Sequence, residues 1–168
     1  MPVHFRTMDD TLHTVEKWDL IIAHPPCTYL TNASAVRMRV NGKIVKERYE
    51  KMLEARSFFL FLMNVSCNKI CIENPVPMKL ANLPPYSQII EPWMFGHPYA
   101  KRTCLWLKGL MHLMPAEIVT EGITPWVNGG NKDAYGNYRR VQGRRERDSK
   151  NRAKTFEGVA KAMAQQWG

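Results

Sequence analysis

The sequence predicts a single α/β domain in which a mostly parallel sheet is flanked by helices. A compact apolar run, Trp18–Ala23, is followed by an amphipathic segment, 47–63, and then by a second apolar run, 69–72. Two short buried strands joined by a helix are typical of a parallel β-α-β unit. We expect residues 1–168 to form one domain, because a chain of 168 residues is long enough to bury a full core.

Each element of this unit has its own signal. The first run ends at His24-Pro25-Pro26, where the prolines stop a strand. The second run is expected to end abruptly at Glu73-Asn74-Pro75, and a third strand is expected at 103–107. In 47–63 the apolar side chains recur every three or four residues, which predicts an amphipathic helix. These side chains are Tyr49, Met52, Leu53, Phe59, Leu60 and Met63.

Other segments are less regular. Asn41-Gly42 predicts a small hairpin or a tight loop turn. The proline-rich stretch 75–98 is expected to be an ordered, irregular loop, and 1–17 is only weakly patterned. A helix over 155–167 closes the chain, with Thr155 as its expected N-cap. Its apolar side is expected to consist of Phe156, Val159, Ala160 and Met163.

A thiol and a carboxylate follow the first two predicted strands. Cys27 comes directly after Pro25-Pro26, and Glu73 follows the second apolar run. If the strands are parallel neighbours, both side chains lie at the carboxyl edge of the sheet, where α/β proteins bind ligands. The rigid turn favours a nucleophilic Cys27, with a buried structural cysteine as the alternative. Glu73 is either its acid partner or a water-facing loop cap.

Positive charge is concentrated near the end of the chain. The net charge is +9, and the segment 139–154 alone contributes +6. This concentration predicts a polyanion partner, DNA or a nucleotide, although a solvated basic loop is the alternative. The surrounding segment 128–154 is expected to be mobile, and Trp126, Tyr135 and Tyr138 either stack on bases or anchor this loop. The residues expected to contact nucleic acid are Arg139, Arg140, Arg144, Arg145 and Arg147.

The remaining composition predicts a soluble cytoplasmic protein. No apolar run approaches the roughly 20 residues of a membrane span, and no secretory leader pattern opens the chain. The four cysteines are therefore expected to be reduced. Cys67 and Cys71 are expected in the core, because no second pair of ligands accompanies them and no metal site is predicted.

Three motifs, taken in order, resemble signatures of the DNA cytosine-5 methyltransferases. Pro25-Pro26-Cys27 is similar to the family's Pro-Cys motif, and Glu73-Asn74-Pro75 to its Glu-Asn-Val motif. The segment 95–103, FGHPYAKRT, is similar to its aromatic-Gly-x-Pro-Gln-x-Arg-x-Arg motif. More closely, 18–108 and 155–167 resemble short, mostly phage-encoded proteins labelled cytosine methyltransferase. The resemblance implies a truncated Rossmann-like sheet of the class I methyltransferase type. It also implies that a phage-encoded protein of this kind is located in the cytoplasm of the bacterial host.

The resemblance also implies roles for single residues. Cys27 would add to carbon 6 of cytosine and Glu73 would pair with ring nitrogen 3, so that carbon 5 becomes nucleophilic. Asn74 would hold the loop, and Lys101 or Arg102 would orient the base or the thiolate. The target base would be flipped out of a duplex or presented single-stranded. S-adenosylmethionine would be the methyl donor, contacted by Asp9 or Asp10 and by Pro25.

The chain departs from the family pattern at several positions. Thr28 replaces the usual Gln, and Lys101 and Thr103 take the two Arg positions. Only 17 residues precede Trp18, and none is the Gly of a donor-binding turn. Either a partner chain completes the donor site or methylation has been lost. The alternatives are a non-catalytic module that binds nucleic acid or a nucleotide, and a thiol-dependent enzyme that acts on a free pyrimidine nucleotide. An uncovered sheet edge makes a homodimer a further expectation.

Overall fold

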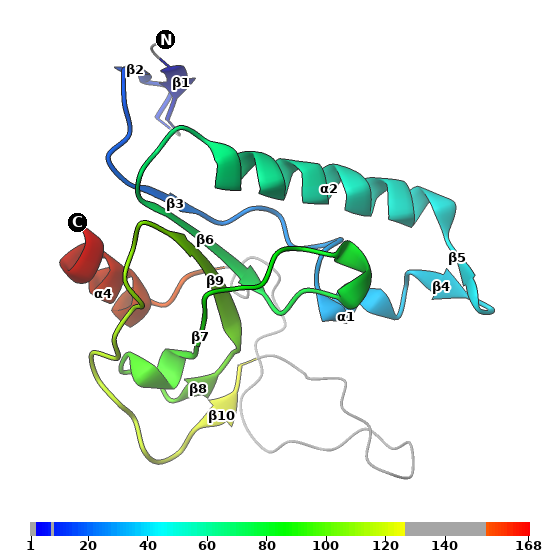
Figure 1. Cartoon of the computed structure of the whole chain (residues 1–168). Helices are drawn as coiled ribbons and strands as arrows, with labels where there is room; N and C mark the ends of the chain where they lie inside the picture. Colours follow the sequence, from blue (N-terminus) through cyan, green and yellow to red (C-terminus); the bar gives the residue numbers. More distant parts are fainter. Residues whose placement is uncertain (1–2, 8, 127–153) are drawn as a thin grey trace.

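A four-stranded sheet forms the centre of the protein (Figure 1). The computed structural model describes residues 3–7, 9–126 and 154–168. The strands lie in the order β3 (Ile21–Ala23), β6 (Ile70–Pro75), β9 (Thr103–Lys108) and β7 (Gln88–Ile90).

The α/β class is confirmed, but the expectation of a mostly parallel sheet is wrong. β3 and β6 are parallel, whereas β6–β9 and β9–β7 are antiparallel. Parallel neighbours need a long crossover, usually a helix, and α2 supplies one between β3 and β6. The chain between β6 and β9 holds only short turns and strands, so β9 returns antiparallel. The sheet is therefore mixed, and it does not establish a Rossmann-like fold.

Helices cover both faces of the sheet. α2 (Lys46–Asn64) agrees closely with its predicted span and buries Met52 and Phe59. The Phe59 ring meets Trp106 of β9 edge-on, with 4.9 Å between the ring centroids. The expected core residue Leu53 is instead 38% exposed. α4 (Glu157–Trp167) lies across the opposite face (Figure 1). Successive strand side chains alternate between the two cores: Ile70 and Ile72 face α2, and Cys71 faces α4.

The C-terminal helix differs in detail from its prediction. The N-cap is Phe156 rather than Thr155, and the side chain of this N-cap residue makes no capping hydrogen bond. Ala160 is exposed, so it does not belong to the apolar side. The buried residues of α4 are Val159, Ala162, Met163 and Trp167.

The proline-rich stretch contains more regular structure than the sequence predicts. It includes the 3-10 turns η1 (Lys79–Ala81) and η2 (Pro92–Met94) and the edge strand β7, and β8 (Tyr99–Ala100) follows directly after it. β8 pairs in parallel with β10 (Thr124–Pro125).

Two hairpins and a short helix complete the described chain. β4 (Arg39–Val40) and β5 (Lys43–Ile44) form the predicted hairpin. Its turn residues Asn41 and Gly42 have φ values of 50° and 78°, the left-handed pair that a tight two-residue turn requires. β1 (Val3–Arg6) and β2 (Leu12–Val15) form a hairpin that the sequence did not indicate, and it projects beyond the sheet (Figure 1).

Short helix α1 (Asn32–Ala35) follows the turn that carries Cys27. No helix among the described residues has both the length and the apolar character that a membrane crossing requires.

Candidate functional site

The strand β6 continues through the Glu73-Asn74-Pro75 motif instead of ending before it. β6 remains paired with β9 as far as Pro75, opposite Thr103. The pairing of β6 with β3 ends earlier, at Ile72, which is opposite Ala23, the last residue of β3. The proline is tolerated as the final residue of the strand. Glu73 and Asn74 therefore stand just past the end of β3, beside the turn that follows it.

Glu73 bonds to two side chains from distant parts of the chain. Its Oε2 lies 3.1 Å from Nδ1 of His24 and accepts a hydrogen bond from the Thr155 hydroxyl at 3.3 Å. The Glu73 side chain is only 11% exposed, whereas that of His24 is 44% exposed. The hydrogen bond to Glu73 raises the pKa of His24, although burial and the Lys101 charge oppose the rise. Sequence reasoning missed Thr155, which it placed as a helix cap.

Asn74 fixes the turn after β3. It is 1% exposed, and its Nδ2 donates a 3.0 Å hydrogen bond to the carbonyl oxygen of the buried Pro25. Because a buried carbonyl is costly to leave without a donor, this bond ties the Pro25-Pro26-Cys27 turn to β6. The turn then closes on itself: the Cys27 carbonyl accepts hydrogen bonds from the amides of Leu30 and Thr31.

Cys27 is the most accessible of the four thiols. It is half-buried, whereas Cys67, Cys71 and Cys104 are buried. Burial raises the pKa of Cys71 to about 12 and that of Cys104 to about 11, so both stay protonated thiols. The expected core positions of Cys67 and Cys71 are confirmed. Cys27 occupies the turn held by Asn74, and within the described residues its thiol makes no hydrogen bond, to Glu73 or to another group.

A small cavity lies on the side of Glu73 that faces α4. Its volume is about 10 Å³, close to the minimum for one water molecule. Lys101 lines it together with Glu73 and Thr155, so it is the cation of the 95–103 motif that reaches this site. Arg102 is exposed and does not line the cavity.

Aromatic rings close the far side of this cavity. Phe156 contacts His97, Tyr99 and Trp126, with ring centroids 5.0, 5.8 and 5.0 Å away. The Lys101 ammonium lies 5.7 Å from the centre of the same ring. Because the Trp126 ring is packed against Phe156 and Tyr99, the geometry favours its reading as an anchor.

The residues proposed to contact the methyl donor have other partners. Asp9 and Asp10 lie in the β1–β2 turn, where hydrogen bonds from Thr7 and Thr11 lower the pKa of Asp9. Asp10 pairs with Arg6 at 3.2 Å. Both carboxylates therefore already interact with side chains of the exposed β1–β2 hairpin. Pro25 is buried, and its carbonyl oxygen accepts the hydrogen bond from Asn74. The described residues therefore do not fit S-adenosylmethionine in the way the resemblance implies.

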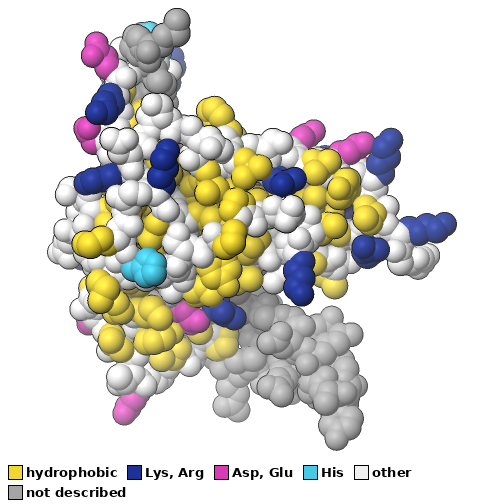
Figure 2. Space-filling view, viewed as in Figure 1, with side chains coloured by type: hydrophobic (Ala, Val, Ile, Leu, Met, Phe, Trp, Pro, Cys, Tyr) yellow, Lys and Arg dark blue, Asp and Glu magenta, His cyan; other side chains and the backbone are white. Residues whose placement is uncertain are grey.

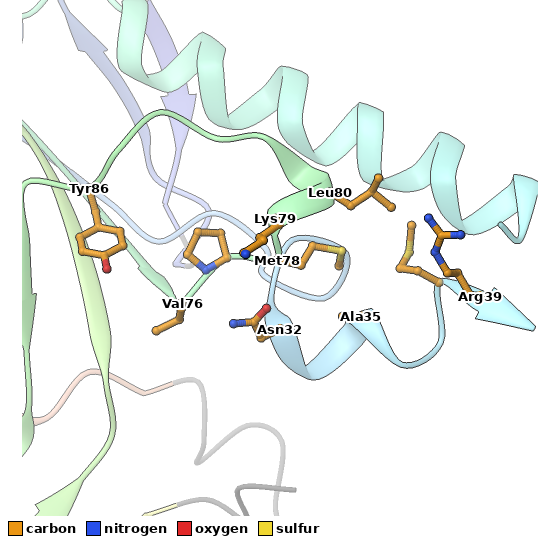
Figure 3. Close-up of a pocket in the computed structure, with 10 residues that line it drawn as sticks. Asn32, Ala35, Arg39, Val76, Met78, Lys79, Leu80 and Tyr86 are labelled. Carbon is orange, nitrogen blue, oxygen red and sulfur yellow. The ribbon is translucent and has the colours of Figure 1, made fainter. Parts of the chain in front are cut away.

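A larger groove, which the sequence did not predict, lies beyond the end of β6 (Figure 3). Its volume is about 660 Å³, within the range of ligand-binding pockets. Its walls come from two regions far apart in the sequence, 32–39 and 76–86, so no single motif signals it. They consist of Asn32, Ala35, Met38, Arg39, Val76, Pro77, Met78, Lys79, Leu80 and Tyr86.

The five arginines expected to contact nucleic acid, 139, 140, 144, 145 and 147, lie outside the described residues. Within the described part, no group of three or more His, Cys, Asp or Glu side chains is arranged to hold a metal ion.

No family model, curated protein or solved structure matches the chain.

Proposed function

We propose that this protein acts on cytosine in DNA as a cytosine-5-methyltransferase-like enzyme, with Cys27 as the nucleophile and Glu73 as the acid. The observation that supports this proposal is the pair of bonds across the end of β3. Asn74 holds the turn of Cys27, and Glu73 bonds to His24 on the same turn. A thiol and a carboxyl group are thereby attached to one rigid corner of the sheet, and a pyrimidine ring needs both groups for addition at carbon 6.

In the proposed reaction the Cys27 thiolate forms a bond to carbon 6 of cytosine. The electrons of the 5,6 double bond move through the ring, and nitrogen 3 takes up the proton held between Glu73 and His24. Carbon 5 is then enamine-like and accepts a proton from water. The hydroxide left from that water removes the original hydrogen of carbon 5 as a proton, and the thiolate leaves carbon 6. Cytosine is regenerated with the new hydrogen at carbon 5, and nitrogen 3 returns its proton. Lys101 supplies positive charge beside Glu73.

S-adenosylmethionine is the methyl donor that the resemblance implies. The donor site that the resemblance implies does not fit the described residues, and the steps assigned to Cys27 and Glu73 do not involve it. This disagreement favours a second candidate function, in which the same corner binds or activates a pyrimidine without methyl transfer. The substrate is then a nucleic acid that is only bound, or a free pyrimidine nucleotide.

Exchange of the hydrogen at carbon 5 tests the addition step without a methyl donor. A cytosine-containing oligonucleotide in deuterated buffer is expected to gain deuterium at carbon 5 when the protein is added. Cys27→Ser is expected to abolish this exchange, because the alcohol is a far weaker nucleophile than a thiolate. Mass spectrometry of the recovered nucleosides measures the incorporation.

Cys67→Ser is the matched control, because Cys67 is also a reduced thiol but lies in the core. It is expected to retain exchange in the fraction that folds. Full exchange in Cys27→Ser contradicts the nucleophile assignment. Exchange with free deoxycytidine monophosphate but not with the oligonucleotide favours the free-nucleotide alternative. Calorimetric titration with S-adenosylmethionine separates methyl transfer from both alternatives.

A further inference from the structure

The groove beyond β6 combines an apolar floor with cations and an aromatic ring at its ends. Met38 and Met78 are buried beneath it. Figure 3 shows Tyr86 at one end of the groove and Arg39 at the other, with Lys79 between them. Tyr86 is 40% exposed. Its ring lies edge-on to the Trp106 ring, with 6.0 Å between the ring centroids. Among the residues that the structure describes, no carboxylate lines the groove.

Beside the groove, the β4–β5 hairpin forms a basic projection. Residues 37–46 carry Arg37, Arg39, Lys43 and Lys46 and no Asp or Glu, a charge of +4 in ten residues. Figure 2 shows Lys and Arg side chains gathered at this end of the molecule. On the first turns of α2, two carboxylates pair with lysines: Glu50 with Lys46 and Glu47 with Lys51.

The groove also adjoins the turn that carries Cys27. The Asn32 amide donates to the Val76 carbonyl at 3.1 Å, and the Met78 amide donates to the Leu30 carbonyl at 2.8 Å. Together these two bonds make the antiparallel β-bridge between Thr31 and Pro77. The segment that begins at Cys27 is thus joined to the floor of the groove by two backbone hydrogen bonds. Asn32, which lines the groove, therefore lies on the segment that follows the Cys27 turn.

We propose that this groove binds single-stranded DNA. The bases lie against the apolar floor and the Tyr86 ring, and the phosphates lie along Lys79, Arg39 and the β4–β5 hairpin. Apolar and aromatic surface is what exposed bases stack on, and a neighbouring row of cations without carboxylates complements the phosphate charge. A duplex hides its base faces, so it does not use the floor. The location next to Cys27 rests on the proposed function, whereas the binding itself does not.

Fluorescence anisotropy with a labelled oligothymidylate tests the groove, because this probe contains no cytosine and cannot report on the chemistry at Cys27. Lys79→Gln and Arg39→Gln are each expected to weaken binding several-fold. Each is also expected to reduce the slope of log affinity against log salt by about 0.7, the value for one lost contact to a single-strand phosphate. Tyr86→Leu is expected to weaken binding about tenfold through lost stacking.

Two matched controls separate these effects from changes in folding or net charge. Tyr86→Phe keeps the ring and is expected to bind like the wild-type protein. Lys17→Gln removes one exposed charge from the connection between β2 and β3 and is expected to leave the salt slope unchanged. Groove variants that bind like Lys17→Gln overturn the proposal, and so does a duplex that binds as tightly as the single strand with no effect of Tyr86→Leu. If the wild-type protein binds oligothymidylate as expected but does not exchange hydrogen at carbon 5 of cytosine, the result counts against the catalytic proposal alone.

Discussion

The His24 imidazole reports directly on the protonation of the site. Its pKa is raised by the hydrogen bond to Glu73, while burial and the charge of Lys101 act in the opposite direction. A histidine whose pKa is raised by folding stabilises the fold fully below its unfolded pKa of about 6.5. That contribution is lost as the pH rises through the folded pKa.

Replacement of Glu73 by Gln removes the group that raises the His24 pKa. Burial and Lys101 both lower the pKa and both remain, so we expect the pKa of His24 in Glu73→Gln to fall below about 6.5. Titration of the imidazole protons by NMR measures the change. Glu91→Gln is the control, because Glu91 lines the same cavity but bonds to Trp93. An unchanged His24 titration in Glu73→Gln contradicts the assigned contact.

At the scale of elements, the sequence predicted the strands and helices that carry a strong hydrophobic pattern. α2 and β9 agree with their predicted spans to within one residue at each end. The continuation of β6 through Pro75 was missed, because a proline is read as a strand end unless the pairing of the neighbouring strands is known. β7 was missed because Ile89-Ile90 is too short an apolar run to distinguish from a loop.

α4 approaches the 95–97 segment so closely that Gly158 has no room for a side chain. A methyl group there would overlap the Phe95 carbonyl oxygen, and the Gly158 amide donates a 3.0 Å hydrogen bond to Nε2 of His97. In an unhindered helix, Gly→Ala stabilises by about 0.5–1 kcal/mol. Here we expect Gly158→Ala to destabilise the protein by about 1–3 kcal/mol, because the helix must move away from Phe95.

Urea unfolding of Gly158→Ala measures this cost. Ala160→Gly, on the exposed side of the same helix, shows the effect of helix propensity alone and is expected to cost about 1 kcal/mol. A Gly158→Ala variant that is more stable than the wild type contradicts the close packing of α4 on Phe95.

At the scale of the whole molecule, the proximity of the Cys27 turn to Glu73 and Asn74 was predictable only from the order of the strands in the sheet. A parallel β3–β6 pair was enough to place the turn of Cys27 next to β6. The bond from Thr155 to Glu73 joins residues 82 positions apart, and it depends on how α4 packs, which no local pattern encodes. The groove depends in the same way on two separate regions, 32–39 and 76–86. The pairing of β3 with β6 was therefore accessible to sequence reasoning, whereas the antiparallel pairs of β9 and the contacts set by the packing of the last helix were not.

The net positive charge of the protein comes from two segments of the chain. Residues 37–46 carry +4 and 139–154 carry +6, so the rest of the chain, with the net total of +9, sums to −1. If binding to DNA depends on local phosphate contacts, the position of a charge matters more than the total. The triple variant Arg144→Gln, Arg145→Gln, Arg147→Gln tests this dependence, because it lowers the net charge from +9 to +6 within one segment.

We expect this variant to lose affinity for duplex DNA and to show a smaller salt slope, by about 0.9 for each phosphate contact removed. The control carries Arg6→Gln, Lys17→Gln and Lys161→Gln, which also gives +6 but removes exposed charges scattered over the described surface. Its salt slope is expected to match that of the wild type. Binding isotherms over a range of salt concentrations measure both slopes. Equal losses in the two variants would mean that the total charge, rather than the 139–154 segment, attracts DNA.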